Sequence, residues 1–368
     1  MKASPVLFLF ICLFLSCRES SQDSRTEIAA AMEASLVNES LAKWYRMSMD
    51  MVHGGFLSAF TYDFKPTDDQ RKMIVTQARH TWTNAKAALR YPDVAHYKSG
   101  ARHGFEFLRD VMWDKERGGF FTMVSREGEL QEQDPQKTAY GNAFGLYALS
   151  AYYAQTGDTS GLRMAKQSFA WLEAHSHDPK LGGYYQHLNR DGSPMVRSIL
   201  TESTSDLGYK DQNSSIHLLE AFTEFYQVAP DTLVRKRLEE MLLLIRDNIV
   251  TPKGYLTLFL TPEFVPVSFR DSTAEVIEKH HYLDHVSFGH DVETAYLLLE
   301  ASHVLGWEND TTTMRIAKKM VDHALVNGWD DRDGGFYDEG YYFKDRSGIT
   351  ITVNTKNWWA QAEGLTPY

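Results

Sequence analysis

The stretch Gly54-Gly55-Phe56 decides the fold, because the chain repeats it four more times with small changes. The other copies are Gly118-Gly119-Phe120, Gly182-Gly183-Tyr184, Gly254-Tyr255 and Gly334-Gly335-Phe336. Measured from the last glycine of each copy, the spacings are 64, 64, 71 and 81 residues. A helix-like run, apolar at i, i+3, i+4 and i+7, follows each copy. A unit of this length fits an outer helix, a glycine-marked turn with short strands, and an inner helix. Repeated around an axis, such units predict an all-α toroid.

The periodic segments predict the positions of the helices. We expect them at 27–49, 68–89, 96–113, 138–155, 160–175, 213–228, 231–249, 289–305 and 310–326, with a last one from Asn357 onward. The even members are rich in alanine, leucine and aromatic residues, which is typical of inner helices. The inner helices should therefore begin near Asp68, Thr138, Asn213, Gly289 and Asn357, with the glycine phrases in turns or short β-hairpins outside them.

Composition limits the class of partner. The chain has 368 residues, of which 43% are hydrophobic and 24% charged, as expected for one large soluble domain. Its net charge of -11 disfavours nucleic acid and an anionic membrane, since both need a basic surface. The chain also contains 8 Trp, 19 Tyr and 20 Phe. These aromatic residues fit core packing, sugar stacking in a central cleft, or both.

The N-terminus is predicted to be a signal segment. Lys2 precedes an apolar run, Pro5 to Leu15, that is too short to span a bilayer. It ends in Phe14-Leu15-Ser16-Cys17, which resembles a bacterial lipoprotein cleavage box; an ordinary signal peptide is the alternative. We therefore expect residues 1–17 to be a lipoprotein-like signal, 18–26 a tether and 27–368 the toroid. The protein should be exported, periplasmic or in the outer membrane, and held at a membrane only by a lipid on Cys17.

Polar residues gather at the openings of two inner helices. Asn213 and His217 are four residues apart, and His290 and Glu293 three apart, so each pair shares a helix face. In a toroid these openings point into one funnel, which favours a binding site; ordinary helix capping is the alternative.

Five phrases, in order, carry a resemblance to a known family. They are Gln77-Ala78-Arg79, KTAYGNAFGLYALSAYY (137–153), NSSIHLLEA (213–221), SFGHDVE (287–293) and KNWWAQAE (356–363). Over about residues 30–368 the chain resembles the N-acylglucosamine 2-epimerase family, which includes cellobiose and mannobiose 2-epimerases and aldose-ketose isomerases. The resemblance implies an (α/α)6 barrel. The chain departs from the family in having no final Trp-x-x-Pro-Tyr-His phrase, so we expect an incomplete barrel whose last hairpin is missing.

The resemblance also implies a site. It gives catalytic roles to His290, His217, Arg79 and Glu293, and substrate binding to Asn213, Trp358, Trp359, Tyr140 and Asn142, the last standing where the family has Gln. The implied reaction removes the C2 proton of a reducing-end sugar through an enediolate. A histidine with a pKa near neutral suits the proton transfer. A permanent cation, Arg79, suits the developing oxyanion. Glu293 could hold His290 in one tautomer.

Two other functions remain open at this stage. A glycoside hydrolase or lyase on the same toroid would need two opposed carboxylates, for which Asp114, Asp211 and Glu293 are available. A catalytically impaired chain that only binds a mono- or disaccharide is the third hypothesis, because the family's second proton-transfer histidine is absent. We expect no cofactor and no metal; His280 and His281 are adjacent, so their side chains should point apart.

Overall fold

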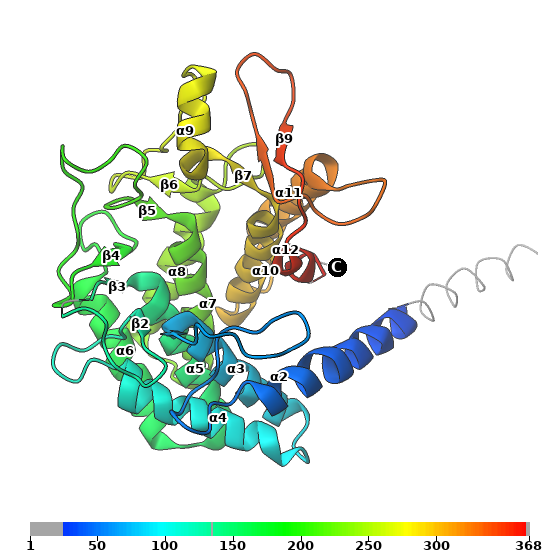
Figure 1. The fold of residues 1–368 in the computed structure, drawn as a ribbon. Helices are drawn as coiled ribbons and strands as arrows, with labels where there is room; N and C mark the ends of the chain where they lie inside the picture. The colour runs from blue at the N-terminus through cyan, green and yellow to red at the C-terminus, as the bar shows by residue number, and fades with distance from the viewer. Residues whose placement is uncertain (1–24, 134, 366–368) are drawn as a thin grey trace, which may run out of the picture.

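The computed structural model describes residues 25–133 and 135–365. The predicted signal segment, with Cys17, lies outside the described residues, and so does most of the predicted tether. Figure 1 shows a mainly helical molecule in which the short strands follow one another along one edge. Within the described ranges, no helix is long and apolar enough to cross a bilayer.

Inner helices pack side by side in chain order. They are α3 (Ile74–Arg90), α5 (Ala139–Thr156), α7 (Gln212–Val228), α10 (Phe288–Val304) and α12 (Trp358–Glu363). Residues 141–152 of α5 are all buried, because α3 and α7 cover it on both sides. In the part of the chain described, no packing contact of comparable extent joins α12 to α3, so these five helices form an open series.

An outer layer covers the inner one. It consists of a helical segment at 25–47 that includes η1 (Leu36–Leu41) and α2 (Ala42–Met47), then α4 (Ala95–Phe107) with η2 (Leu108–Met112), α6 (Thr159–His175), α8 (Thr232–Leu244) with η3 (Ile245–Ile249), and α11 (Thr311–Gly328). Each of α4, α6, α8 and α11 packs on the inner helix that precedes it. This alternation is the predicted α/α hairpin arrangement.

Two details differ from the sequence prediction. Helix α3 begins at Ile74 rather than near Asp68, because the preceding loop is held by Gln70, whose side chain bonds the backbone of Ala59 and Ser58. The short helix α9 (Ala274–Asp284) was not predicted.

Antiparallel strand pairs connect successive units. They are β1 (Lys72–Met73) with β2 (Met123–Val124), β3 (Lys137–Thr138) with β4 (His187–Leu188), β5 (Lys210–Asp211) with β6 (Phe259–Leu260), and β7 (Val286–Ser287) with β8 (Glu339–Tyr341), which also pairs with β9 (Thr350–Val353). Helices α3, α5, α7 and α10 each begin directly after the first strand of a pair. Their N-termini therefore lie at the end of the barrel where the strands are.

The glycine phrases lie in turns, as predicted. Gly54 and Gly55 have φ values of 77° and 64°, which side chains with a Cβ rarely adopt. The fourth copy is shifted by one residue: Leu256, not Tyr255, forms the β-bridge that Phe120 forms in the second copy.

An ion pair braces four of the five turns to the start of the strand or helix that follows; the first three pairs are buried, and the last is partly exposed. The pairs are Lys72–Asp50 at 3.0 Å, Lys137–Asp114 at 2.9 Å, Lys210–Asp178 at 2.9 Å and Lys356–Asp330 at 2.7 Å. We call these lysines, with Val286 in the fourth unit, the brace positions. Thr251 and Val286 replace both partners there. Losing both avoids leaving one buried charge unpaired.

Candidate active site

The side chains at one equivalent position of the inner helices lie close to those of the neighbouring inner helices. This position lies seven residues after the brace position and is occupied by Arg79, Phe144, His217, Glu293 and Glu363. The first four form a continuous series. The Arg79 guanidinium lies 4.3 Å from the Phe144 ring centre, the Phe144 and His217 rings are 4.7 Å apart, and His217 Nε2 is 3.7 Å from Glu293 Oε1. The repeat thus brings polar groups from separate helices to one place.

His217 is buried, and its Nδ1 is hydrogen-bonded. Its Nδ1 lies 2.8 Å from Oε2 of Glu220 on the same helix, and the edge of Tyr140 packs on its ring at 5.2 Å. Burial lowers the pKa of His217 although Glu220 opposes the effect. Burial raises the pKa of Glu220, but the hydrogen bond from His217 and the charge of Arg79 bring it below its ordinary value. An ionised Glu220 therefore accepts a hydrogen bond from Nδ1–H, and the Nε2 lone pair faces Glu293.

Glu293 is the acid of this cluster. Burial raises its pKa well above the ordinary value, and the carboxylates of Glu363 and Glu220 add to the effect. This shift favours the protonated form of Glu293, whose single O–H can donate either to His217 or to an oxygen that enters the site. We expected Glu293 to hold His290, but its carboxylate lies beside His217 instead.

His290 is held by Ser287, which directly precedes α10. The Ser287 Oγ lies 2.7 Å from His290 Nδ1. Thr138 and Asp211 occupy the same position before α5 and α7, and their side chains cap those helices, whereas Ser287 makes no such cap. Its hydroxyl serves His290 instead. Burial lowers the pKa of His290 to about 3, and His217 and His285 add to the effect. His290 is therefore neutral at physiological pH, and its Nε2 lone pair is available when Nδ1–H donates to Ser287; its pKa lies below the near-neutral value expected from the sequence.

Arg79 supplies the positive charge of the site. Burial lowers its pKa, but Glu220, Tyr140 and Glu293 outweigh that effect and raise it overall. The guanidinium is reachable by solvent and remains charged at every relevant pH. Tyr140 lies beside it, and burial raises the pKa of the Tyr140 hydroxyl, which therefore stays a donor.

The remaining predicted residues lie in three different settings. Trp359 packs on His290 with ring centres 4.7 Å apart, whereas Trp358 is 80% exposed. Asn213 is half-buried in the first turn of α7, and its side chain makes no hydrogen bond to any described residue.

Asn142 does not join the cluster. Its Oδ1 accepts from the backbone N–H of Phe120 at 2.8 Å, and its Nδ2 donates to the carbonyl of Thr138 at 2.9 Å. Gln77 and Gln361 occupy the same position on α3 and α12 and also accept from the backbone N–H of Phe56 and Phe336, but their Nε2 groups donate back to the carbonyls of the same two residues. Both polar atoms of Asn142 are thus occupied, Oδ1 in fastening the turn and Nδ2 at the start of its own helix.

Sequence reasoning missed several members of the cluster. Glu220 lies three residues after His217, a spacing that would have found it. Glu363 and Phe144 can be identified only after the brace positions show which residues of the inner helices are equivalent. Ser287 belonged to a quoted phrase but received no role.

The sequence and the fold of this chain are similar to those of known sugar epimerases and isomerases. The family described as N-acylglucosamine 2-epimerase (GlcNAc 2-epimerase) matches residues 54–367. The cellobiose 2-epimerase of Bacteroides fragilis is 28% identical over 338 residues, which cover 92% of this chain and 80% of that protein. The D-mannose isomerase of Marinomonas mediterranea is 24% identical over 347 residues, covering 93% and 79%. The solved structure of the cellobiose 2-epimerase from Spirochaeta thermophila matches with a TM-score of 0.78 and 28% identity, over 93% of this chain and 78% of that one.

Proposed function

We propose that this chain, which belongs to the N-acylglucosamine 2-epimerase family, moves a proton at C2 of a reducing-end aldose with His290 as the base. The chain is a carbohydrate epimerase or isomerase. The observation that supports the finer proposal is a neutral His290, oriented through Nδ1 by Ser287, in the same site as the permanent cation Arg79.

The proposed reaction begins on the open-chain sugar. His290 Nε2 takes the C2 proton, and the electron pair moves to the C1 carbonyl to give an enediolate. Arg79, and Glu293 in its protonated form, stabilise the developing negative charge on oxygen, which is usually the largest single contribution in such sites. Transfer of the O2 proton to O1 and return of a proton to C1 give the ketose, whereas return of a proton to the opposite face of C2 gives the 2-epimer. Trp359 and Tyr140 provide apolar surface for the sugar ring.

Deuterium exchange tests the proposal. The purified protein is incubated in D2O with cellobiose and, separately, with D-mannose, and the sugars are followed by NMR. We expect an isomeric sugar that carries deuterium at C2 or C1, and the labelled carbon identifies the product. His290→Ala should lower the rate of exchange by a factor of about 10² or more. His303→Ala, an exposed position on the same helix, is the control. Release of monosaccharide, or binding without exchange, would contradict the proposal.

Export is a separate proposal. The support is Lys2, the apolar run up to Leu15 and Cys17. Expression of the full chain in a bacterium, with mass analysis of the mature N-terminus, should find a lipid-modified Cys17. An unprocessed N-terminus in the cytoplasm would contradict it.

A further inference from the structure

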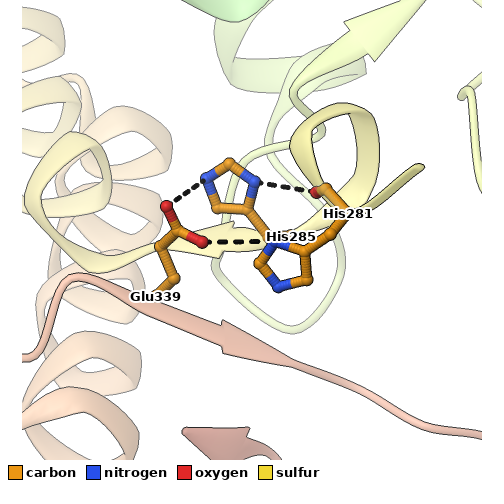
Figure 2. Close-up of side chains that lie close together, drawn as sticks. All are labelled: His281, His285 and Glu339. Carbon is orange, nitrogen blue, oxygen red and sulfur yellow. Dashed lines mark hydrogen bonds and ion pairs between the residues drawn. The ribbon is translucent and has the colours of Figure 1, made fainter. Parts of the chain in front are cut away.

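A second cluster of polar side chains lies outside the active site. It joins His281, near the end of α9, and His285, directly after α9, to Glu339 on β8. His281 Nδ1 is 3.3 Å from Glu339 Oε2, and His285 Nε2 is 3.7 Å from Glu339 Oε1. The two imidazole rings are nearly parallel, with centres 5.2 Å apart. Figure 2 shows both rings turned toward the one carboxylate.

The tautomer of His285 is fixed by a backbone group. Its Nδ1 lies 3.0 Å from the carbonyl oxygen of His281, which can only accept a hydrogen bond. Nδ1 of His285 must therefore carry the proton, and in the neutral ring Nε2 is a lone pair. That lone pair faces an oxygen of Glu339, which is also an acceptor. Two acceptors face each other, and a cation between them would satisfy both.

His281 is oriented by a hydroxyl. Its Nε2 lies 3.1 Å from Thr352 Oγ1 on β9, so Nε2–H can donate there and leave the Nδ1 lone pair toward Glu339. A partner on the second ring nitrogen is the usual way in which a protein orients a ligating histidine. Each imidazole of the cluster is thus oriented by a hydrogen bond from the nitrogen that does not face Glu339.

We propose that His281, His285 and Glu339 bind one divalent first-row transition ion, such as Zn²⁺. Two imidazoles and one carboxylate are a donor set that this class of ion accepts. One candidate ligand atom from each residue lies within 4.8 Å of the other two. Ligands of a tetrahedral Zn²⁺ lie about 3.4 Å from one another, given bonds of about 2.0 to 2.2 Å. The distances to Glu339, 3.3 Å from His281 to Oε2 and 3.7 Å from His285 to Oε1, are close to that separation.

The cluster is open enough for an ion to enter. The side chains of His281, His285 and Glu339 are 25%, 13% and 28% exposed. Three protein ligands leave a fourth position for water, as in open zinc sites.

The ion would tie α9 to β8 beside the active site. Glu339 pairs in register with Ser287, and Ser287 holds His290. A metal at Glu339 would therefore fix the strand that carries the partner of the proposed base. The proposal stands on its own geometry and does not depend on the sugar chemistry.

Metal titration of the full chain tests the site. The protein is prepared without a polyhistidine tag, treated with a chelator, and titrated with Co²⁺ by visible absorption and with Zn²⁺ by calorimetry. We expect saturation at one equivalent, cobalt bands of a four-coordinate nitrogen and oxygen site, and a higher melting temperature with the ion. Glu339→Gln and His285→Gln should each lose the binding and the thermal shift.

His303→Ala is the matched control, since it removes an exposed histidine from another helix, and it should bind like the original chain. X-ray absorption of the zinc-loaded original chain gives a reading that does not depend on variants folding: two imidazoles and a carboxylate are expected. Failure to bind one equivalent, a different ligand set, or undiminished binding in folded Glu339→Gln and His285→Gln would each overturn the proposal.

Discussion

Replacing Lys210 by Met should destabilise the protein more than a surface change could. The Lys210 ammonium is 2% exposed, lies 2.9 Å from Asp178, and also donates to the carbonyls of Gly182 and Pro262 at 2.7 and 3.0 Å. Methionine matches the length of the side chain, so the change removes the charge and the donors with little loss of volume. Asp178, at 3% exposure, would remain buried without its cation.

The loss of unfolding free energy depends on the hydrogen bonds that Asp178 still accepts in the variant. Two backbone N–H groups, at 3.0 and 3.1 Å, and the Tyr185 hydroxyl, at 2.9 Å, still donate to it. Breaking a buried pair by removing one partner costs about 3 to 5 kcal/mol. With three donors left, we expect a loss near the lower end, about 3 kcal/mol. The double variant Asp178→Thr, Lys210→Val copies the natural Thr251 and Val286 of the fourth unit. It should cost less than the single variant, because no buried charge is left alone.

Urea unfolding followed by circular dichroism measures both variants. The pH dependence gives an independent check. Burial raises the pKa of Asp178, but hydrogen bonds, that of Lys210 foremost, bring it to about 2. A carboxyl whose pKa falls on folding stabilises the native state above its unfolded pKa of about 3.9, and loses that contribution as the pH falls toward 2. The difference between the original chain and Lys210→Met should therefore shrink from pH 5 to pH 2. A Lys210→Met variant that loses less than about 1 kcal/mol, or a double variant as unstable as Lys210→Met, would refute the reasoning.

Three further predictions concern the site and its supports. Ser287→Ala should lower kcat by about fivefold with an unchanged melting temperature, since one hydrogen bond of about 1 kcal/mol orients His290, and an unchanged kcat would exclude that role. Trp359→Ala should raise KM by about two- to tenfold through lost stacking, while Trp358→Ala serves as the exposed control and should leave KM alone. Asn142→Ala should lower stability by about 1 to 3 kcal/mol, because it leaves a buried backbone N–H unpaired, and a change in KM without a change in stability would show instead that Asn142 binds substrate.

The sequence predicted the fold well because its signal is local. The glycine phrases and the helical periodicity each lie within one unit, and four of the five predicted inner-helix starts lie within one residue of the observed ones. The start of α3 was wrong because a loop held by one side chain, Gln70, delays the helix. Nothing in the periodicity of residues 68–73 reveals that contact.

The site was only partly predictable, for reasons that differ between residues. Arg79, His217 and Glu293 lie at one repeated position, and the structure brings them together. The pairing of Glu293 with His217 rather than with His290 depends on how side chains meet between α7 and α10, which spacing along one helix cannot show. Glu339 is 54 residues beyond His285, and only the register of β7 on β8 places them in contact.

The unit that carries His290 is fastened differently from its neighbours. Its brace partners are Thr251 and Val286, so the buried ion pair that anchors β1, β3 and β5 is absent at β7. Strand β7 instead belongs to the one three-stranded sheet in the described part of the chain, where β8 is backed by β9. His281 and His285 then meet Glu339 across that sheet. A bound metal ion would thus supply, for the strand that leads into the proposed base, the electrostatic anchor that lysine and aspartate supply to the other three strands.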